Sequence, residues 1–422
     1  MNNRIVAQWI APIMLLFPFQ TAVAYDWRVP SQAAIDLAQK TIILDGHVDI
    51  PYRIAQSGED IGEATGSGDF DYPRAIKGGL NAPFMSIYVA ARFQESGGAK
   101  AQADRLIGLV EGIAYQHPDK FEIAKSVADV ERITATGKIA LPMGMENGAP
   151  IEGDLANLDH FYARGIRYIT LTHSRINHIS DSSYDEERRW DGLSPFGELL
   201  VKRMNDLGVM VDISHVSDAA FFDVIKQTRA PVIASHSSAR KFTPGFERNM
   251  SDEMIKALGK NGGVIMINFG SLFLTQTYSD WRANYNDAYD QYALTNKSEK
   301  DDDLEEEFRE EFLPSNPVPF ADVDDVIDHI DHVKSLIGID HIGLGSDYDG
   351  VGDSLPVGLK DASTMPNLVQ GLMDRDYSNE EIIKILSGNA IRVWRAVEDA
   401  ADPDLEITLP VKIKRKKFLR QK

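Results

Sequence analysis

Eight short apolar runs recur along the chain, and their regular spacing constrains the fold more than any other feature. Each run is nearly continuous in β-branched or bulky apolar residues, which is typical of strands buried on both faces. The runs cover residues 41–44, 84–89, 139–145, 166–171, 209–213, 231–234, 263–268 and 342–345. Amphipathic stretches of helical length lie between them, at residues 101–115, 155–164, 195–207, 218–228, 251–259 and 322–336, and a last helical block covers 379–398. This alternation predicts an α/β fold, the (β/α)8 TIM-like barrel, although an open doubly wound sheet has the same local pattern.

The composition excludes several kinds of site. The chain has no cysteine, and its 44 Lys and Arg residues against 64 Asp and Glu residues give a formal charge of −20. The absence of cysteine removes disulfides, thiolate zinc sites, cysteine nucleophiles and iron–sulfur clusters, so any metal must be held by His, Asp, Glu or a carbonyl. The acidic balance argues against nucleic acid as a partner, because phosphate contacts need clustered Lys and Arg.

Residues 1–24 have the pattern of an export signal. Arg4 is the only charged residue there, an apolar stretch over 5–17 follows, and the segment ends in Ala-Val-Ala, a small-x-small cleavage site. The apolar stretch is shorter than the ~20 residues that a membrane span needs. We therefore expect cleavage after Ala24, a periplasmic or secreted protein, and no integral membrane segment once the signal is removed.

Two charged segments stand apart from the expected barrel domain, residues 25–400. An acidic insertion is expected at about 285–315, and it is densest over 299–311, EKDDDLEEEFREE. A solvated helical insertion explains this composition most simply, and a docking surface is the alternative. Residues 401–422 end in the basic stretch VKIKRKKFLRQK, which we expect to be a disordered tail, with contact to anionic lipid or cell wall as the alternative.

Polar residues fall at the ends of the predicted strands. His47 and Asp49 lie two apart at the end of the first strand, so their side chains point the same way and offer one nitrogen and one oxygen to a cation. Other strand ends carry Glu146, His173, His215, His236 and Asp347. In a parallel barrel these ends meet at one rim, where active sites of this fold lie. Four of the ten histidines of the chain lie at these strand ends. A local hydrogen bond would account for any one of them, but it does not account well for all four at one rim, so we predict a metal site.

The number of these groups predicts two ions. Glu146 would bridge them, His47 and Asp49 would complete one site, and His215 and His236 would complete the other. Two ions about 3.5–4 Å apart can share a water, lower its pKa and polarise a carbonyl. We expect a hydroxide formed in this way to be the nucleophile.

Two further groups remain for proton transfer and charge stabilisation. Asp347 is suited to act as a base for the water and as a proton donor to a leaving amine, and His173 to stabilise the oxyanion of a tetrahedral intermediate. We expect His178 to be a candidate for the pocket wall and the remaining histidines to be exposed or structural, namely His117, His160, His329, His332 and His341.

The chain resembles the membrane (renal-type) dipeptidases, of the metallo-dependent amidohydrolase superfamily. The matching stretches run in unbroken order from Asp45 to Glu398: DGHVDIP, GMENG, GIRYITLTHS, GLSPFGELLVKRMNDLGVMVDISHVSD, PVIASHSSAR, ERNMSDE, GGVIMINF, IGLGSDYDG and NAIRVWRAVE. The most specific feature is SHSSAR following DISHVSD. Mammalian members are disulfide-linked and lipid-anchored, and neither property carries over to a chain without cysteine and with a basic tail. Gly270 also stands where many relatives have a larger side chain, which puts one pocket wall in doubt.

The resemblance implies a metallo-dipeptidase with two Zn2+ per subunit, held by the five residues named above. It implies that His173 contacts the scissile region, that Asp347 is the catalytic acid/base, and that Arg248 grips the free carboxylate of the dipeptide, a suitable partner for a guanidinium. Small dipeptides, including L,D-dipeptides, are the implied substrates, and a homodimer is one assembly to consider. The alternatives are a related barrel amidohydrolase acting on N-acyl amino acids, β-lactams or lactones, and a metal-binding or solute-binding protein without turnover.

Overall fold

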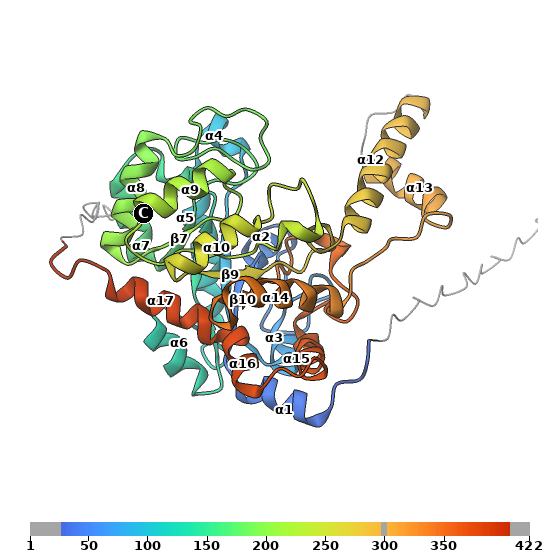
Figure 1. Ribbon diagram of the computed structural model, residues 1–422, viewed down its shortest axis with the longest axis horizontal. Helices are drawn as coiled ribbons and strands as arrows, with labels where there is room; N and C mark the ends of the chain where they lie inside the picture. Colours follow the sequence, from blue (N-terminus) through green and yellow to red (C-terminus); the bar gives the residue numbers. More distant parts are fainter. Residues whose placement is uncertain (1–26, 297–301, 406–422) are drawn as a thin grey trace, which may run out of the picture.

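A closed barrel of eight parallel strands forms the centre of the protein (Figure 1). The computed structural model describes residues 27–296 and 302–405, so the predicted signal and nearly all of the predicted basic tail lie outside the described residues. The strands follow one another around the barrel in the order β1-β10-β9-β8-β7-β6-β5-β2. Their bounds are β1 (Ile43–Val48), β2 (Leu80–Tyr88), β5 (Met143–Glu146), β6 (Ile166–Thr170), β7 (Met210–Asp212), β8 (Ile233–Ala234), β9 (Val264–Ile267) and β10 (Ile342–Leu344). The closed order excludes the open doubly wound sheet.

The predicted run at 139–145 is two strands rather than one. β4 (Ile139–Leu141) pairs with β3 (Phe121–Ile123) in a small separate sheet, and β5 alone enters the barrel. Pro142 separates β4 from β5, because proline has no backbone N–H to donate to a neighbouring strand. Its carbonyl still accepts a hydrogen bond from the Met85 N–H at 2.8 Å. β3 is too short to give a recognisable pattern in the sequence.

β1 continues further than predicted, so His47 lies within the strand rather than after it. The apolar run ends at 44 because Asp45 and Gly46 interrupt it, but the backbone stays extended through both. A side chain at Gly46 would collide with the Ser235 carbonyl, which follows β8, and with Met266 of β9, so glycine here permits close approach of residues from strands that are not neighbours of β1. The strand therefore carries His47 to the rim of the barrel.

Helices surround the barrel, and several begin where a capping residue predicts. The side chains of Ser194, Ser217 and Ser251 each accept a hydrogen bond from a backbone N–H in the first turn of the helix that follows. The main outer helices are α1 (Gln32–Lys40), α5 (Ala99–Gln116), α6 (Val127–Thr134), α7 (Leu155–Arg164), α8 (Pro195–Leu207), α9 (Asp218–Gln227), α10 (Asp252–Asn261), α14 (Val323–Ile337), α15 (Met365–Asp374), α16 (Asn379–Ile383) and α17 (Asn389–Asp399). Shorter helices are α2 (Ile50–Ser57), α3 (Tyr72–Gly78), α4 (Arg92–Ser96) and α11 (Ser271–Leu274). Among the described residues, no helix is long and apolar enough to span a bilayer.

The acidic insertion forms a helical hairpin that projects from the barrel (Figure 1). It consists of α12 (Gln276–Asn296) and α13 (Asp302–Phe312). One face of the hairpin is apolar, with a small cluster of its own made of Tyr285, Tyr289, Ala293, Leu304 and Phe308. The insertion is therefore helical, as predicted, but it is held together by aromatic packing rather than being solvated on all sides.

The buried His329 of α14 predicts a loss of stability in acid. Its Nδ1 accepts from the Ala239 N–H at 2.9 Å and its Nε2–H donates to the Leu274 carbonyl at 3.0 Å, so the neutral ring is fully paired. Burial lowers the pKa of His329 from 6.5 to about 4. The unfolded chain therefore binds the proton first as the pH falls, so the stability present above pH 6.5 is lost progressively between about pH 6.5 and pH 4.

We expect this group to remove about 2 kcal/mol of unfolding free energy between pH 7 and pH 5. Urea unfolding of wild type and His329→Gln at both pH values measures this, because the difference between the two proteins isolates one group from the other histidines. An equal pH dependence in the two proteins would show that His329 does not titrate in this way.

Candidate metal centre

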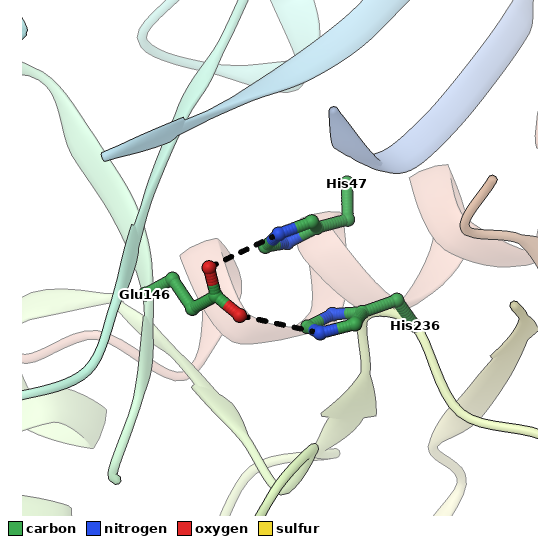
Figure 2. A group of neighbouring side chains, drawn as sticks. All are labelled: His47, Glu146 and His236. Atoms are coloured by element: carbon green, nitrogen blue, oxygen red, sulfur yellow. Dashed lines mark ion pairs between the residues drawn. The ribbon is translucent and has the colours of Figure 1, made fainter. Parts of the chain in front are cut away.

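The five predicted ligands converge at the carboxyl-end rim of the barrel. Glu146 lies at their centre: its Oε2 is 3.4 Å from His47 Nε2, and its Oε1 is 3.1 Å from His215 Nε2 and 3.4 Å from His236 Nε2. Figure 2 shows the Glu146 carboxylate between the His47 and His236 rings. Asp49, the residue directly before α2, places its Oδ2 3.5 Å from His47 Nε2. Glu146 thus faces the three imidazoles of the predicted ligand set, and His173 Nε2 lies 3.5 Å from the same Oε1, an arrangement that suits a bridging ligand.

Buried polar atoms without partners indicate that a cation fits here. Among the described residues, His47 Nε2 and Asp49 Oδ1 are buried and have no hydrogen-bond partner, which is rare for buried polar atoms. His215 Nε2 and His236 Nε2 lie 2.9 Å apart and both face Glu146. Nitrogen and carboxylate oxygen are the donors that zinc and related divalent ions take from proteins. The residues present therefore suit divalent metal.

Three sets of ligand atoms lie close enough to hold an ion, all atoms of a set falling within 4.8 Å of one another. The sets are His47–Glu146–His236, Glu146–His173–His215 and His47–Asp49–Asp347. Glu146 belongs to two of them, which agrees with a bridging role. The geometry also places His173 and Asp347 within reach of an ion, so their assignment to substrate and proton transfer stays a prediction.

The charges of the site favour ligand binding. Burial lowers the pKa of both His215 and His236 well below 6.5, and the positive charge of Arg248 lowers each further, so both rings are neutral at pH 7. Burial opposes ionisation of Glu146, but the positive charges of His47 and His173 outweigh it and hold its pKa well below 4.5. Neutral imidazole and ionised carboxylate are the protonation states that bind metal. Burial lowers the pKa of His47, but Tyr168, Glu146 and Asp49 outweigh it and hold that pKa well above 6.5, so His47 must release a proton when it binds metal.

Hydrogen bonds behind the ligands fix the orientation of two rings. The Tyr168 hydroxyl donates to the Gly46 carbonyl at 3.1 Å, and it therefore accepts from His47 Nδ1 at 2.9 Å. His236 Nδ1 likewise contacts Ser235 Oγ at 2.7 Å, and that hydroxyl donates to Asp212 Oδ2 at 2.6 Å. With each Nδ1 carrying its proton, each Nε2 is left to bind metal.

These supporting residues were not singled out from the sequence. Their signal is present, since Tyr168 and Asp212 are polar residues inside apolar runs that read as fully buried strands. A buried polar residue needs a partner, but the sequence does not say which strand supplies it.

Asp347 lies beside this centre in the turn that follows β10. Its backbone has φ 61°, and Asn268 Nδ2 donates to its Oδ2 at 2.8 Å. Burial raises the pKa of Asp347 to about 7, with the positive charge of His47 opposing the rise and the negative charge of Asp49 adding to it. A carboxyl group with this pKa can both accept and donate a proton near neutral pH.

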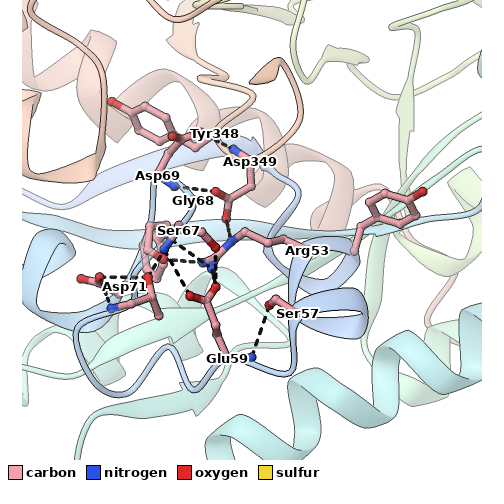
Figure 3. A network of polar contacts seen from close by, with 12 residues as sticks. Arg53, Ser57, Glu59, Ser67, Gly68, Asp69, Asp71, Tyr348 and Asp349 are labelled. Atoms are coloured by element: carbon pink, nitrogen blue, oxygen red, sulfur yellow. Dashed lines mark hydrogen bonds and ion pairs between the residues drawn. The ribbon is translucent and has the colours of Figure 1, made fainter. Parts of the chain in front are cut away.

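A partly buried ion-pair network holds this turn against the helix that follows Asp49 (Figure 3). Arg53 of α2 donates from Nε to Asp349 Oδ2 at 2.8 Å and from a terminal nitrogen to Glu59 Oε2 at 2.6 Å. The backbone N–H of Asp69 donates to Asp349 Oδ1 at 2.6 Å, and the Asp349 N–H donates back to Asp69 Oδ2 at 2.8 Å. The network therefore joins the loops that carry Asp49 and Asp347.

Gly350, at the end of the same turn, leaves no room for a side chain. A Cβ at this position would collide with Asp347 Oδ1 and with Asp49 Oδ2. We expect Gly350→Ala to displace both carboxylates and to lower kcat/KM on the order of 100-fold, the effect of a misplacement of about 1 Å at a reacting group. Steady-state kinetics and the melting temperature would be compared with those of Gly112→Ala, where the added Cβ meets open space. Unchanged kinetics in a folded Gly350→Ala protein would contradict the geometry.

A cavity of about 900 Å³ opens over the candidate centre. Its inner wall contains His173, Arg248 and Asp347 as well as metal-ligand candidates, so all eight predicted site residues lie in or against one site. Arg248 is almost fully buried and donates to Ser237 Oγ at 2.6 Å and to the His236 carbonyl at 2.8 Å, while its Nε has no partner among the described residues. His178 lines a different cavity and takes no part in this one.

Comparison with known proteins identifies the family and agrees with this fold. A family model described as membrane dipeptidase (peptidase family M19) matches residues 31–407. Dipeptidase tcpJ of Claviceps purpurea is 35% identical over 342 residues, which is 79% of this chain and 71% of that protein. Dipeptidase aclJ of Aspergillus oryzae is 36% identical over 351 residues, 82% and 73% of the two chains. The crystal structure of the probable dipeptidase PvdM from Pseudomonas aeruginosa superposes with a TM-score of 0.74 at 28% identity, covering 88% of this chain and 98% of that one.

Proposed function

Since the chain belongs to the membrane dipeptidase family, peptidase family M19, we propose that it hydrolyses dipeptides, L,D-dipeptides included, with two zinc ions at the centre described above. The observation that carries this proposal is the convergence of three imidazoles and Asp49 around one buried carboxylate, Glu146, with Asp347 beside them. His47 and Asp49 would hold one ion and His215 and His236 the other, with Glu146 shared. Ions held there would lower the pKa of a water and polarise the substrate carbonyl.

The chain's own residues would move the protons and bind the substrate. Asp347 would take a proton from the attacking water and pass it to the nitrogen of the leaving amine, a transfer that its pKa of about 7 suits. His173 lines the cavity beside Glu146, where it would contact the oxygen of the scissile carbonyl as negative charge develops there. The Arg248 guanidinium, whose Nε has no partner, would bind the carboxylate end of the substrate.

Capture of both ends of the substrate would limit the length of peptide that is cleaved. The carboxylate would bind Arg248, and the free amine would be read by the metal centre or by acidic groups nearby, such as Asp49. A longer peptide would have no free carboxylate at the right distance from the reacting carbonyl. Dipeptides with both ends unblocked are therefore the expected substrates.

An assay of blocked and unblocked substrates tests this proposal. Purified, zinc-loaded protein would be given L-Ala-D-Ala, its N-acetyl form and its C-terminal amide, each with and without a chelator. We expect hydrolysis of the free dipeptide alone, abolished by the chelator and restored by added zinc. Cleavage of the N-acetyl form would instead favour a related amidohydrolase that acts on N-acyl amino acids, and chelator-resistant cleavage would remove the metal from the reaction.

We also propose that the protein is exported and that residues 1–24 are its cleaved signal. The support is the pattern of the sequence itself, a short apolar stretch after a single arginine with a small-x-small end. Fractionation of the producing cell and N-terminal sequencing of the mature protein would test this, and the expected first residue is Tyr25. A mature chain that keeps residues 1–24 would contradict it.

A further inference from the structure

The α12–α13 hairpin forms part of the wall of the cavity that contains the candidate centre. The cavity wall runs from Glu146 and His236 out to Trp281, Glu305 and Arg309 on the two helices of the hairpin. At about 900 Å³ the cavity is near the upper end of the ~300–1,000 Å³ that pockets for drug-sized ligands occupy. A dipeptide of small residues leaves much of this space unfilled, so the outer part is available to a substrate side chain.

The basic residues of the hairpin line the cavity, whereas most of its acidic residues do not. Within α12 and α13 the sequence has only two basic residues, Arg282 and Arg309, and both line the cavity. The same helices are rich in Asp and Glu, yet of their described acidic side chains Glu305 alone lines it. An insertion whose net charge is strongly negative therefore presents its positive charges to the cavity.

Neither arginine has a hydrogen-bond or ion-pair partner for its side chain among the described residues. Arg282 lies over the Tyr285 ring at 5.3 Å but makes no hydrogen bond or ion pair there, and Arg309 makes none with its side chain in the described part of the chain. Glu305, the nearby acid, instead accepts a hydrogen bond from the Tyr285 hydroxyl at 3.0 Å. Both guanidinium groups are exposed at the cavity wall and free to bind an anion.

Other charges around the outer cavity are already paired. Arg175 lies 3.6 Å from Asp185, and Asp353 lies 3.8 Å from Lys360. Aromatic surface adjoins the two free arginines, since Tyr278, Trp281 and Phe320 also line this part of the cavity. The outer cavity thus combines an apolar wall with unpaired positive charge, which suits a side chain with a methylene stem and a terminal carboxylate.

We propose that Arg282 and Arg309 form a specificity subsite for an acidic side chain of the substrate, so that dipeptides containing a glutamate-like residue are preferred. The inference rests on the proposed dipeptidase function and adds a substrate class to it. The subsite is separate from Arg248, which is buried beside His236 and is assigned to the main-chain carboxylate.

Isosteric pairs of substrates test the subsite. Values of kcat/KM would be measured for L-Ala-L-Glu against L-Ala-L-Gln and for L-Glu-L-Ala against L-Gln-L-Ala, with L-Ala-L-Ala as the neutral reference. We expect wild type to prefer the acidic member of at least one pair. Each of Arg282→Gln and Arg309→Gln should reduce that preference about fivefold, the range for exposed charge pairs, while hydrolysis of L-Ala-L-Ala stays unchanged. The preference should also weaken at high salt.

A matched control separates the subsite from overall charge. Lys256→Gln removes the same charge from the exposed face of α10, away from the cavity, and should leave every ratio unchanged. An acidic preference that survives in the double variant Arg282→Gln/Arg309→Gln, or that is absent from wild type, would overturn the subsite.

A binding measurement distinguishes failure of the subsite from failure of the proposed function. Calorimetric titration of the same substrate pairs into full-length Asp347→Asn protein measures affinity without turnover. If wild type cleaves none of these dipeptides, the proposed function fails. The subsite would still be supported if the Asp347→Asn protein binds the acidic member of a pair more tightly and if adding Arg282→Gln and Arg309→Gln removes that preference. Equal binding of acidic and amide members would refute it.

Discussion

Glu146→Gln is expected to abolish metal binding and to lower kcat/KM by at least about 1,000-fold, because metal assistance contributes several kcal/mol to such reactions. The substitution keeps the size of the side chain but removes its negative charge and replaces one oxygen by an amide nitrogen that cannot bind metal. Glu146 Oε1 faces both His215 and His236, and Oε2 faces His47, so no other described carboxylate can take its place between them.

The variant should fold, which makes the result interpretable. Glu146 is the last residue of β5, and its side chain points toward the His47 and His236 rings rather than toward apolar side chains. Metal content per chain, the melting temperature in chelator and turnover would be measured together for wild type, Glu146→Gln and Glu253→Gln. The control makes the same chemical change on the exposed side of α10 and should match wild type in all three.

Two results would contradict the bridging assignment. Full metal content with full turnover would show that Glu146 is not a ligand. Loss of half the metal with partial turnover would show that Glu146 serves one ion only, and that the second site is completed by another group, for which His173 is the candidate within reach.

The barrel could be predicted from the sequence because every strand is buried on both faces. Such strands appear as continuous apolar runs, and each of the eight runs overlaps a strand of the barrel. The errors arise where local and tertiary effects compete. Pro142 divides one run between two sheets. β1 continues through Asp45 and Gly46, where Ser235 and Met266 from elsewhere in the barrel approach too closely for any residue but glycine.

The candidate ligands could be predicted because their positions depend on one rule, that parallel strand ends share a rim. Their supporting residues depend instead on contacts between distant parts of the chain. Tyr168 contacts His47 across the barrel from a strand that is not a neighbour of β1, and Arg53 contacts Asp349 although 296 residues separate them. Neither contact leaves a local pattern in the sequence.

For the acidic hairpin, too, the sequence predicts the secondary structure but not the contacts with distant parts of the chain. Its composition predicts a helical insertion, but composition does not say which side of the helices faces the cavity. The sequence therefore gives no sign that Arg282 and Arg309 face the cavity while, of the described acids of the hairpin, only Glu305 does. A segment that composition alone assigns to solvent becomes a wall of the site.

Asp347→Asn is expected to lower kcat by about 100- to 10,000-fold with little change in KM, the range for loss of a general acid–base group. Asparagine keeps the size of the side chain and tolerates the left-handed backbone of this turn, φ 61°. Its amide oxygen can still accept from Asn268, which holds the native carboxylate at 2.8 Å. What is lost is the ability to take a proton from water and to return it to the leaving nitrogen.

The metal content of the variant decides between two roles for Asp347. If it acts by proton transfer, Asp347→Asn keeps its metal and loses turnover. If it is a ligand, as its place within 4.8 Å of His47 and Asp49 also permits, metal is lost together with activity. Asp376→Asn is the matched control, because Asp376 has the same left-handed conformation, φ 60°, on the exposed outside of the protein. Near-full turnover in Asp347→Asn would exclude both roles and leave proton transfer to another group of the cavity.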